Sequence, residues 1–133
     1  MHDDFHLDLH ADQRLRLAKE MYLKAILQLG KDGPVKPVDL VHCLGVTKGS
    51  VSEMLKKLAE EKFIEYESFR SIKLTPKGRK KANLILRKYH IVRQFLEKTL
   101  KMKGPAVHDD ACNLEHAFSD TAIEKLERFL HKK

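Results

Sequence analysis

Residues 37–61 read PVDLVHCLGVTKGSVSEMLKKLAEE, and this stretch decides the fold that the sequence predicts. Pro37 opens a short helix and Gly45 ends it, because proline is tolerated in the first turn of a helix and glycine favours its end. Thr47 is a suitable N-cap for a second helix that continues to about Glu61. Two short helices joined by a tight, glycine-containing turn form a helix-turn-helix. The second helix has four apolar residues on its inner face, namely Val51, Met54, Leu55 and Leu58.

The start of the second helix carries small and polar side chains on its outward face. A helix end that enters the major groove of DNA needs such side chains, because they can approach the base edges. The residues that we expect to face DNA are Thr47, Lys48, Gly49, Ser50, Ser52 and Glu53.

A β-hairpin is predicted directly after the helix-turn-helix. Residues 63–67 form one strand, residues 68–70 a bend, and residues 71–75 alternate as a return strand. A hairpin at this place makes a winged helix-turn-helix, and Arg70 and Lys73 at or near its tip would contact DNA phosphates. The alternative is a hairpin that only packs against the core and leaves its charges in water.

Before this unit, residues 12–29 show an apolar stripe with helical spacing, with Asp12 as a plausible N-cap and Gly30 as a stop. Residues 1–11 are predicted to be a flexible polar tail. Three histidines spaced four residues apart in the tail could bind a metal, although a short acidic tail is more often without a fixed structure; they are His2, His6 and His10. We therefore expect a DNA-binding domain over residues 12–76.

After the hairpin, Pro76 begins the longest predicted helix, which reaches about Met102. Its first turns carry four basic residues that either face a polyanion or are merely solvated, namely Lys77, Arg79, Lys80 and Lys81. Two more helices follow, and the last one has more apolar surface than a short tail needs, so part of it is expected to face a second subunit. The sequence thus predicts a mainly α fold with a small β-hairpin, in which residues 77–133 form a helical domain.

The helix near the end of the chain carries Cys112, Glu115 and His116. Their spacing of i, i+3 and i+4 puts a thiol, a carboxylate and an imidazole on one face. These groups bind borderline divalent transition metals, but three ligands rarely close a site, so a fourth must come from elsewhere. The alternative is a mixed polar helix with a half-buried cysteine.

The net charge, the apolar runs and the cysteine count restrict which classes of protein this sequence can belong to. The chain has 26 Lys and Arg against 19 Asp and Glu, a net charge of +7, which suggests an anionic partner such as nucleic acid or a membrane surface. No apolar run has the length of a membrane span, and the acidic N-terminus is not a signal peptide. Two cysteines in such a chain suggest a reduced cytoplasmic protein, and a Cys43–Cys112 disulfide is the weaker interpretation.

Three motifs, over roughly residues 14–131, carry a family resemblance. They are Glu20 to Ile26 in the first helix, Leu74 to Arg79 after the hairpin, and His108 to His116 near the end. With these motifs in this order, the chain resembles the diphtheria toxin repressor family of metal-dependent transcriptional repressors. The resemblance implies a homodimer, built from the region after the wing, that binds a palindromic double-stranded DNA operator when it is loaded with metal.

The resemblance also implies a fourth primary ligand, Met21, beside the thiol, carboxylate and imidazole. A thioether and a thiolate suit Fe²⁺, Co²⁺, Ni²⁺ or Zn²⁺ better than the harder Mn²⁺. The manganese-sensing branch has acidic residues where this chain has Met21 and Lys24. The sequence therefore favours Fe²⁺, with Mn²⁺ as a further candidate. The iron-sensing branch usually adds a C-terminal SH3-like domain, and this sequence is similar to the short manganese regulators in having none.

The family's ancillary metal site is altered here. That site uses a His and a Glu on the long helix and a later His, and the first two positions are Tyr89 and Arg93 in this chain. Only His108 matches. His90 lies one residue from the first position and would point about 100° away around the helix. An ancillary site is therefore expected at most from His90 and His108.

Two other functions compete with a metal-activated repressor. The first is a metal-independent or redox-sensing winged-helix regulator, in which the Cys112 cluster is structural or senses oxidation. The second is a small hydrolase that uses Glu115 and His116. The chain lacks a glycine-rich phosphate loop and a convincing catalytic triad, so we expect neither an enzyme nor a small-molecule substrate.

Overall fold

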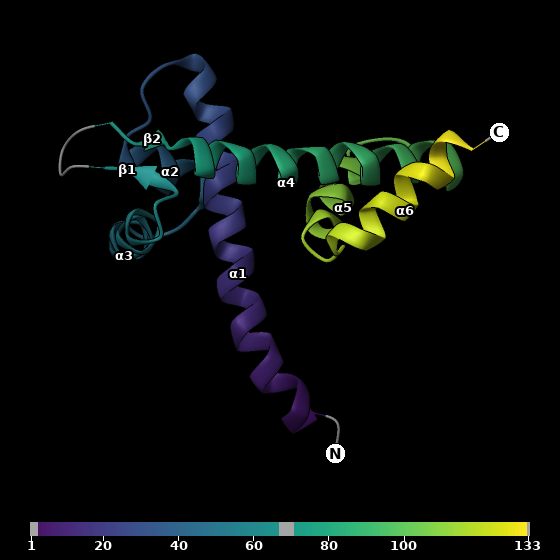
Figure 1. Ribbon diagram of the computed structural model, residues 1–133, viewed down its shortest axis with the longest axis horizontal. Helices are drawn as coiled ribbons and strands as arrows, with labels where there is room; N and C mark the ends of the chain where they lie inside the picture. Colours follow the sequence, from purple (N-terminus) through teal and green to yellow (C-terminus); the bar gives the residue numbers. More distant parts are fainter. Residues whose placement is uncertain (1–2, 67–70, 133) are drawn as a thin grey trace. The chain divides into compact units, whose positions relative to one another are not determined.

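The computed structural model describes residues 3–66 and 71–132, and only the backbone of residues 3–10 (Figure 1). The described residues form a mainly helical structure with a two-stranded hairpin, which confirms the predicted fold class. The helices are α1 (Asp3–Leu29), α2 (Pro37–Leu44), α3 (Lys48–Glu60), α4 (Pro76–Gln94), α5 (Ala106–Glu115) and α6 (Asp120–His131). The strands are β1 (Ile64–Glu65) and β2 (Lys73–Leu74).

The chain divides into two compact units, one ending at Asn83 and the other beginning at Leu84. This division lies inside α4, whereas the sequence placed its boundary at the start of that helix, and the predicted domain limits stay a prediction. Among the described residues, none of the helices has the length and apolar character needed to cross a membrane.

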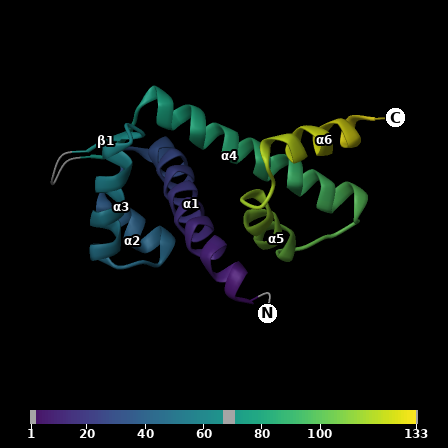
Figure 2. The ribbon, with the colours of Figure 1, turned by 60° about the horizontal axis from the view of Figure 1, so that its bottom comes forward.

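In the first unit α2 packs against both α1 and α3, as Figure 2 shows. The core of this unit consists of apolar side chains from these three helices and from the hairpin. Tyr22 belongs to this core, and its burial raises the pKa of its hydroxyl above the usual value. The largest fully buried side chains here are Leu23, Leu40, Val51, Leu55 and Leu58. Because three of these lie on the predicted inner face of α3, the pattern read from the sequence is confirmed for that helix.

Local signals set the limits of α2 and α3. The backbone N–H of Lys36 donates to the Asp39 carboxylate at 2.8 Å and caps the start of α2. Gly45 ends it with a φ of 65°, a left-handed conformation that costs glycine little. Thr47 Oγ1 accepts from the backbone N–H of Ser50 at 3.1 Å and caps α3. These are the ends that the sequence predicted.

The hairpin is tied to the rest of the first unit at its base. The strands pair antiparallel, Ile64 with Leu74 and Glu65 with Lys73. Ile72 also forms a bridge with Val35, in which its N–H donates to the Val35 carbonyl at 2.7 Å. The bend that the sequence predicted at residues 68–70, with Arg70, lies outside the described residues.

The first turn of α4 lies directly against the residues that lead into β1. Thr75 Oγ1 accepts from the N–H of Gly78 at 3.0 Å and donates to the Lys62 carbonyl at 2.6 Å. A Cβ at Gly78 would lie 1.9 Å from the Phe63 carbonyl oxygen, far below van der Waals contact. Only glycine therefore permits this approach of helix and strand.

Two helix limits differ from the prediction. α1 begins at Asp3, so the backbone of the segment that was predicted to be a tail is helical. α4 ends at Gln94 and continues as a π-helical segment, Phe95–Thr99, in which Leu100 N–H bonds to the Phe95 carbonyl. The predicted end near Met102 was therefore wrong.

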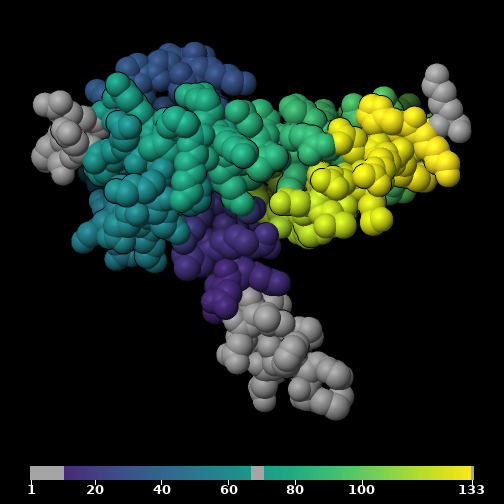
Figure 3. Space-filling view, viewed as in Figure 1, coloured from purple at the N-terminus to yellow at the C-terminus, as the bar shows by residue number. Residues whose placement is uncertain are grey.

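The second unit packs the last part of α4 with α5 and α6, whose joint surface Figure 3 shows in green-yellow and yellow. Ser119 caps α6 by accepting from the N–H of Ala122 at 3.1 Å. Lys88 joins the helices, because its Nζ donates to the Phe118 carbonyl at 3.0 Å and pairs with Asp120 at 2.9 Å. The buried core residues are Tyr89, Ile91, Val92, Leu96, Val107, Ala111 and Ile123.

Candidate DNA-binding surface and metal centre

The first turns of α3 present the polar face that the sequence predicted. All six candidate DNA-contacting residues are exposed, while Val51, the one apolar residue between them, is buried; the six are Thr47, Lys48, Gly49, Ser50, Ser52 and Glu53. The Thr47 hydroxyl also donates to Ser50 Oγ at 3.0 Å, so it serves the cap of the helix. Their contact with DNA stays a proposal.

Two of the four basic residues at the start of α4 serve the fold. Lys77 Nζ donates to the Glu61 carbonyl at 2.8 Å, where it meets the negative end of α3, and lies 4.5 Å from the ring centroid of Phe63. Lys81 lies 3.7 Å from the carboxylate of the buried Glu20. The charge run that suggested a polyanion is thus partly explained by packing, which the sequence pattern alone did not reveal.

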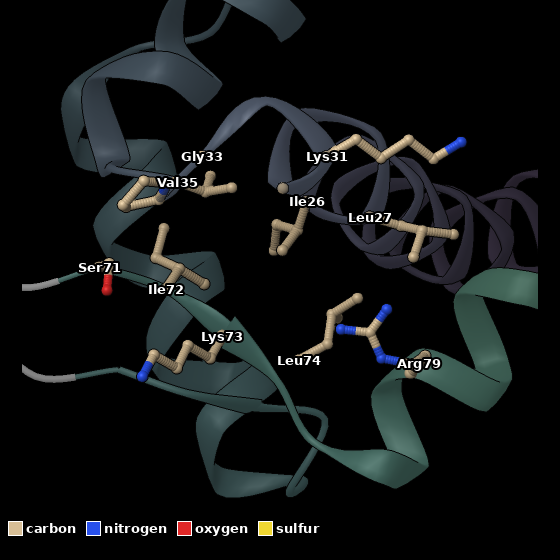
Figure 4. Close-up of a pocket in the computed structure, with 12 residues that line it drawn as sticks. Ile26, Leu27, Lys31, Gly33, Val35, Ser71, Ile72, Lys73, Leu74 and Arg79 are labelled. Atoms are coloured by element: carbon tan, nitrogen blue, oxygen red, sulfur yellow. The ribbon is translucent and has the colours of Figure 1, made fainter.

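A pocket of about 500 Å³ lies behind the hairpin in the first unit (Figure 4). Its walls are mostly apolar side chains from the end of α1 and from β2, with Lys31, Lys73 and Arg79 around them. In the lining that the structure describes there is no carboxylate, thiol or imidazole. Its polar side chains are those of Lys31, Ser71, Lys73 and Arg79.

The three predicted metal ligands of the second unit lie at the C-terminal end of α5. Glu115 is its last residue and only 1% exposed, and His116 follows as the C-cap and is also buried. Glu115 Oε1 lies 3.7 Å from His116 Nε2. Cys112 is half-buried, and its Sγ lies 3.6 Å from His108 Nε2.

These side chains form two pairs and are not gathered around one point. In the part of the chain that the structure describes, no three of the His, Cys, Asp and Glu side chains are close enough together to hold an ion. The donor set nevertheless fits a borderline divalent cation. A carboxylate as deeply buried as that of Glu115 is costly unless a cation or hydrogen-bond donors stabilise it, which agrees with a role in metal binding.

Met21 lies on α1, in the first unit, among buried neighbours. The apolar stripe over residues 12–29 includes Met21 and predicted that it lies in the core. Met21 is instead 41% exposed, while Tyr22, Leu23 and Ala25 are buried. Met21 is therefore not part of the buried core of the first unit. Its part in a metal site stays a proposal.

The positions of the altered ancillary site form a hydrogen-bonded group. Arg93 Nη1 donates to the Tyr89 hydroxyl at 2.7 Å, and the same hydroxyl lies 2.7 Å from His108 Nδ1. The hydrogen bond with Tyr89, and then the one with Glu97, raises the pKa of Arg93. His90 is exposed and touches only the edge of the Tyr89 ring among these groups, with ring centroids 5.3 Å apart. The sequence marked Tyr89 and Arg93 as substitutions, and their i, i+4 spacing was the signal that they would meet.

Both units match models of known protein domains. Residues 14–72 match the iron dependent repressor N-terminal DNA binding domain, and residues 75–132 match the iron dependent repressor metal binding and dimerisation domain. An uncharacterised HTH-type transcriptional regulator of Methanocaldococcus jannaschii is 35% identical over 115 residues, which cover 85% of this chain and 92% of that protein.

Two better-described proteins are similar over most of this chain. The diphtheria toxin repressor of Corynebacterium diphtheriae is 30% identical over 113 residues, covering 84% of this chain and 50% of the repressor. The solved structure of a manganese-dependent transcriptional repressor in complex with manganese is 30% identical with a TM-score of 0.77, covering 84% of this chain and 52% of that one. The chain thus spans about half the length of these two proteins. From its two matched domains and its fold, the chain belongs to the iron-dependent repressor family of metal-dependent transcriptional repressors, together with the diphtheria toxin repressor.

Proposed function

We propose that this chain is a homodimeric cytoplasmic repressor whose affinity for a palindromic operator is raised by Fe²⁺, bound by Met21, Cys112, Glu115 and His116. The observation that carries the proposal is the end of α5, where a thiol, a buried carboxylate and a buried imidazole lie within two turns of one helix. The family pattern assigns the fourth ligand to α1, in the other unit.

The first unit would supply the DNA contacts. The exposed polar start of α3 would enter a major groove, and Lys73 is exposed on β2, in the hairpin that would form the wing. A single recognition helix reads few base pairs, so a dimer with two half-sites is needed for useful specificity.

The coupling between metal and DNA would be a shift between two arrangements of the units. A divalent ion held by these residues would supply a link between α1 and α5. The thiolate and carboxylate provide the negative charge that favours the linked arrangement, and Met21 provides a neutral, soft donor. Metal can act in this way only if the linked arrangement binds it more tightly, and that arrangement must also suit the spacing of two DNA half-sites.

Operator binding as a function of free metal, measured under anaerobic conditions, tests this proposal. Fe²⁺ and Co²⁺ are expected to raise operator affinity by about 5- to 150-fold, the usual range of coupling between two sites. Mn²⁺ should be needed at higher concentration, because it prefers oxygen ligands. Equal DNA affinity with and without every one of these metals would favour the metal-independent or redox-sensing regulator instead.

A further inference from the structure

Four side chains of the second unit form a continuous line that leads to the proposed metal ligand. Arg93 Nη1 is 2.7 Å from the Tyr89 hydroxyl, that hydroxyl is 2.7 Å from His108 Nδ1, and His108 Nε2 is 3.6 Å from Cys112 Sγ. Tyr89 and Arg93 are one turn apart on α4, and His108 and Cys112 are one turn apart on α5. We refer to Arg93, Tyr89 and His108 as the Arg93 chain.

The chemistry of the Arg93 chain determines which group donates each of its hydrogen bonds. A guanidinium can only donate hydrogen bonds, so the Tyr89 oxygen accepts from Arg93 and has its own proton left to give. His108 Nδ1, at 2.7 Å, lies within hydrogen-bond distance of this hydroxyl and can accept that proton. A ring nitrogen that accepts carries no proton, so the proton of the neutral imidazole is on Nε2, which faces the sulfur of Cys112. The positive charge of Arg93 polarises the hydroxyl and makes it a better donor.

We propose that Arg93 and Tyr89 hold His108 with its Nε2–H directed at the Cys112 sulfur, so that His108 is a positioning residue for this sulfur and not a metal ligand. The part that concerns metal rests on the proposed function, in which Cys112 is a primary ligand. Outer partners of this kind orient a ligand and tune its donor strength. The same arrangement leaves His108 no free nitrogen lone pair for an ancillary ion, because Nδ1 accepts from Tyr89 and Nε2 carries the proton, and the Arg93 guanidinium repels such an ion.

The distance of 3.6 Å between Cys112 Sγ and His108 Nε2 is also compatible with one competing interpretation, in which both atoms bind the same metal ion. Two donor atoms on a tetrahedral ion, with metal–sulfur and metal–nitrogen distances of about 2.3 and 2.0 Å, are about 3.5 Å apart. His108 and Cys112 would then bind one ion together. The competing interpretation requires an unprotonated Nε2, whereas the Arg93 chain requires a protonated one, so the position of a single proton separates the two.

Long-range proton–nitrogen NMR of the metal-free chain, labelled with ¹⁵N-histidine, reads that position directly. The chain has eight histidines, so His108→Gln identifies the resonances of His108. The wild type is expected to show one tautomer, with Nδ1 unprotonated and Nε2 protonated. Tyr89→Phe removes only the hydroxyl and should shift the Nδ1 resonance and populate the second tautomer, while Arg93→Gln should give a smaller shift in the same direction.

The matched control is Arg87→Gln, since Arg87 lies on the same helix but pairs with Glu127. It should leave the His108 resonances unchanged, which separates loss of the Arg93 chain from a general loosening of α4. A protonated Nδ1 in the wild type, or identical His108 resonances in the wild type and Tyr89→Phe, would overturn the proposal.

Absorption of the Co²⁺-loaded chain tests the second half of the proposal. A hydrogen bond to a thiolate stabilises its lone pairs, so the sulfur-to-Co²⁺ charge-transfer band should move to longer wavelength in Tyr89→Phe and His108→Gln and keep its intensity. Loss of an imidazole ligand in His108→Gln would make His108 a ligand and overturn the proposal. If the wild type shows no such band while the NMR result is as expected, the proposed metal function fails, and the NMR result alone decides the orientation of His108.

Discussion

At the scale of single residues, Cys112 is the most informative position. Cys112→Ala removes a thiolate from a half-buried site, so fold and dimer should be retained, while metal-dependent operator binding should be lost or need far more metal. Cys112→Asp should partly restore binding and move the preference toward Mn²⁺, because an oxygen donor replaces sulfur. The measurement is operator affinity against free Fe²⁺ or Co²⁺ without oxygen.

Cys43→Ala is the control for this experiment, because it removes the exposed thiol on α2 and leaves the proposed ligands in place. It should respond to metal as the wild type does. A normal metal response in Cys112→Ala would mean that the metal site has been placed wrongly.

Gly78 gives a prediction about stability that does not involve metal. Because an added Cβ would lie 1.9 Å from the Phe63 carbonyl oxygen, Gly78→Ala must displace α4 from β1 and should cost about 2–4 kcal/mol. Gly49→Ala is the matched control. Gly49 lies in α3 with space around its Cα, so that change should stabilise by about 0.5–1 kcal/mol. Urea unfolding curves should order the three proteins in this way, and equal midpoints for Gly78→Ala and wild type would contradict the predicted clash.

At the scale of elements, the sequence predicted α2, α3 and the hairpin because their limits depend on local chemistry. Each limit is set by a residue in the turn itself: Pro37 begins α2, Gly45 ends it, and Thr47 caps the start of α3, as their residue types predicted. The end of α4 was predicted wrongly because nothing in the residues of the π-helical segment marks a change of hydrogen-bond pattern. The roles of Lys77 and Lys81 were missed for a related reason: their partners, Glu61 and Glu20, are distant in sequence.

The candidate site likewise combines features that depend on local spacing with features that depend on residues distant in sequence. Cys112, Glu115 and His116 lie toward the C-terminal end of α5, and their expected place on one face as metal ligands stays a prediction. The spacing did not give the direction of their side chains, which depends on neighbours such as His108. The contact between Tyr89 and His108 joins two helices, so it required a fold before it could be seen.

The hairpin carries a prediction about DNA affinity. Lys73 is exposed on β2, so Lys73→Ala should weaken binding to any DNA sequence and flatten the salt dependence by one phosphate contact, a change of about 0.9 in slope. Ser50→Ala at the start of α3 should instead change which operator bases are preferred. Lys98→Ala, an exposed change outside the first unit, should keep the wild-type slope. The slope is measured by DNA titrations at several salt concentrations, and an unchanged value in Lys73→Ala would exclude a backbone contact by β2.

At the scale of the whole molecule, the second unit has apolar surface that a monomer would leave in water. Phe129 on α6 is 54% exposed, and Leu100 and Leu114 are exposed as well. Phe129→Asp should therefore raise the dissociation constant of the dimer by about 100-fold, since burying an unpaired charge costs several kcal/mol. Sedimentation measures this constant, and Glu124→Lys, an exposed charge change about 140° away around the same helix, is the control. A monomeric wild type, with or without metal, would contradict a palindromic operator.

The base of the hairpin has a consequence for how such chains diverge. Ile64 pairs with Leu74, Ile72 pairs with Val35 and β1 contacts α3, so the bases of both strands are fixed to the rest of the first unit. The number of residues between the two strands is then independent of where α3 lies. Insertions and deletions there can change how much of the DNA backbone a relative covers while its base preference is inherited unchanged. Natural selection could adjust general affinity and operator choice as two separate traits.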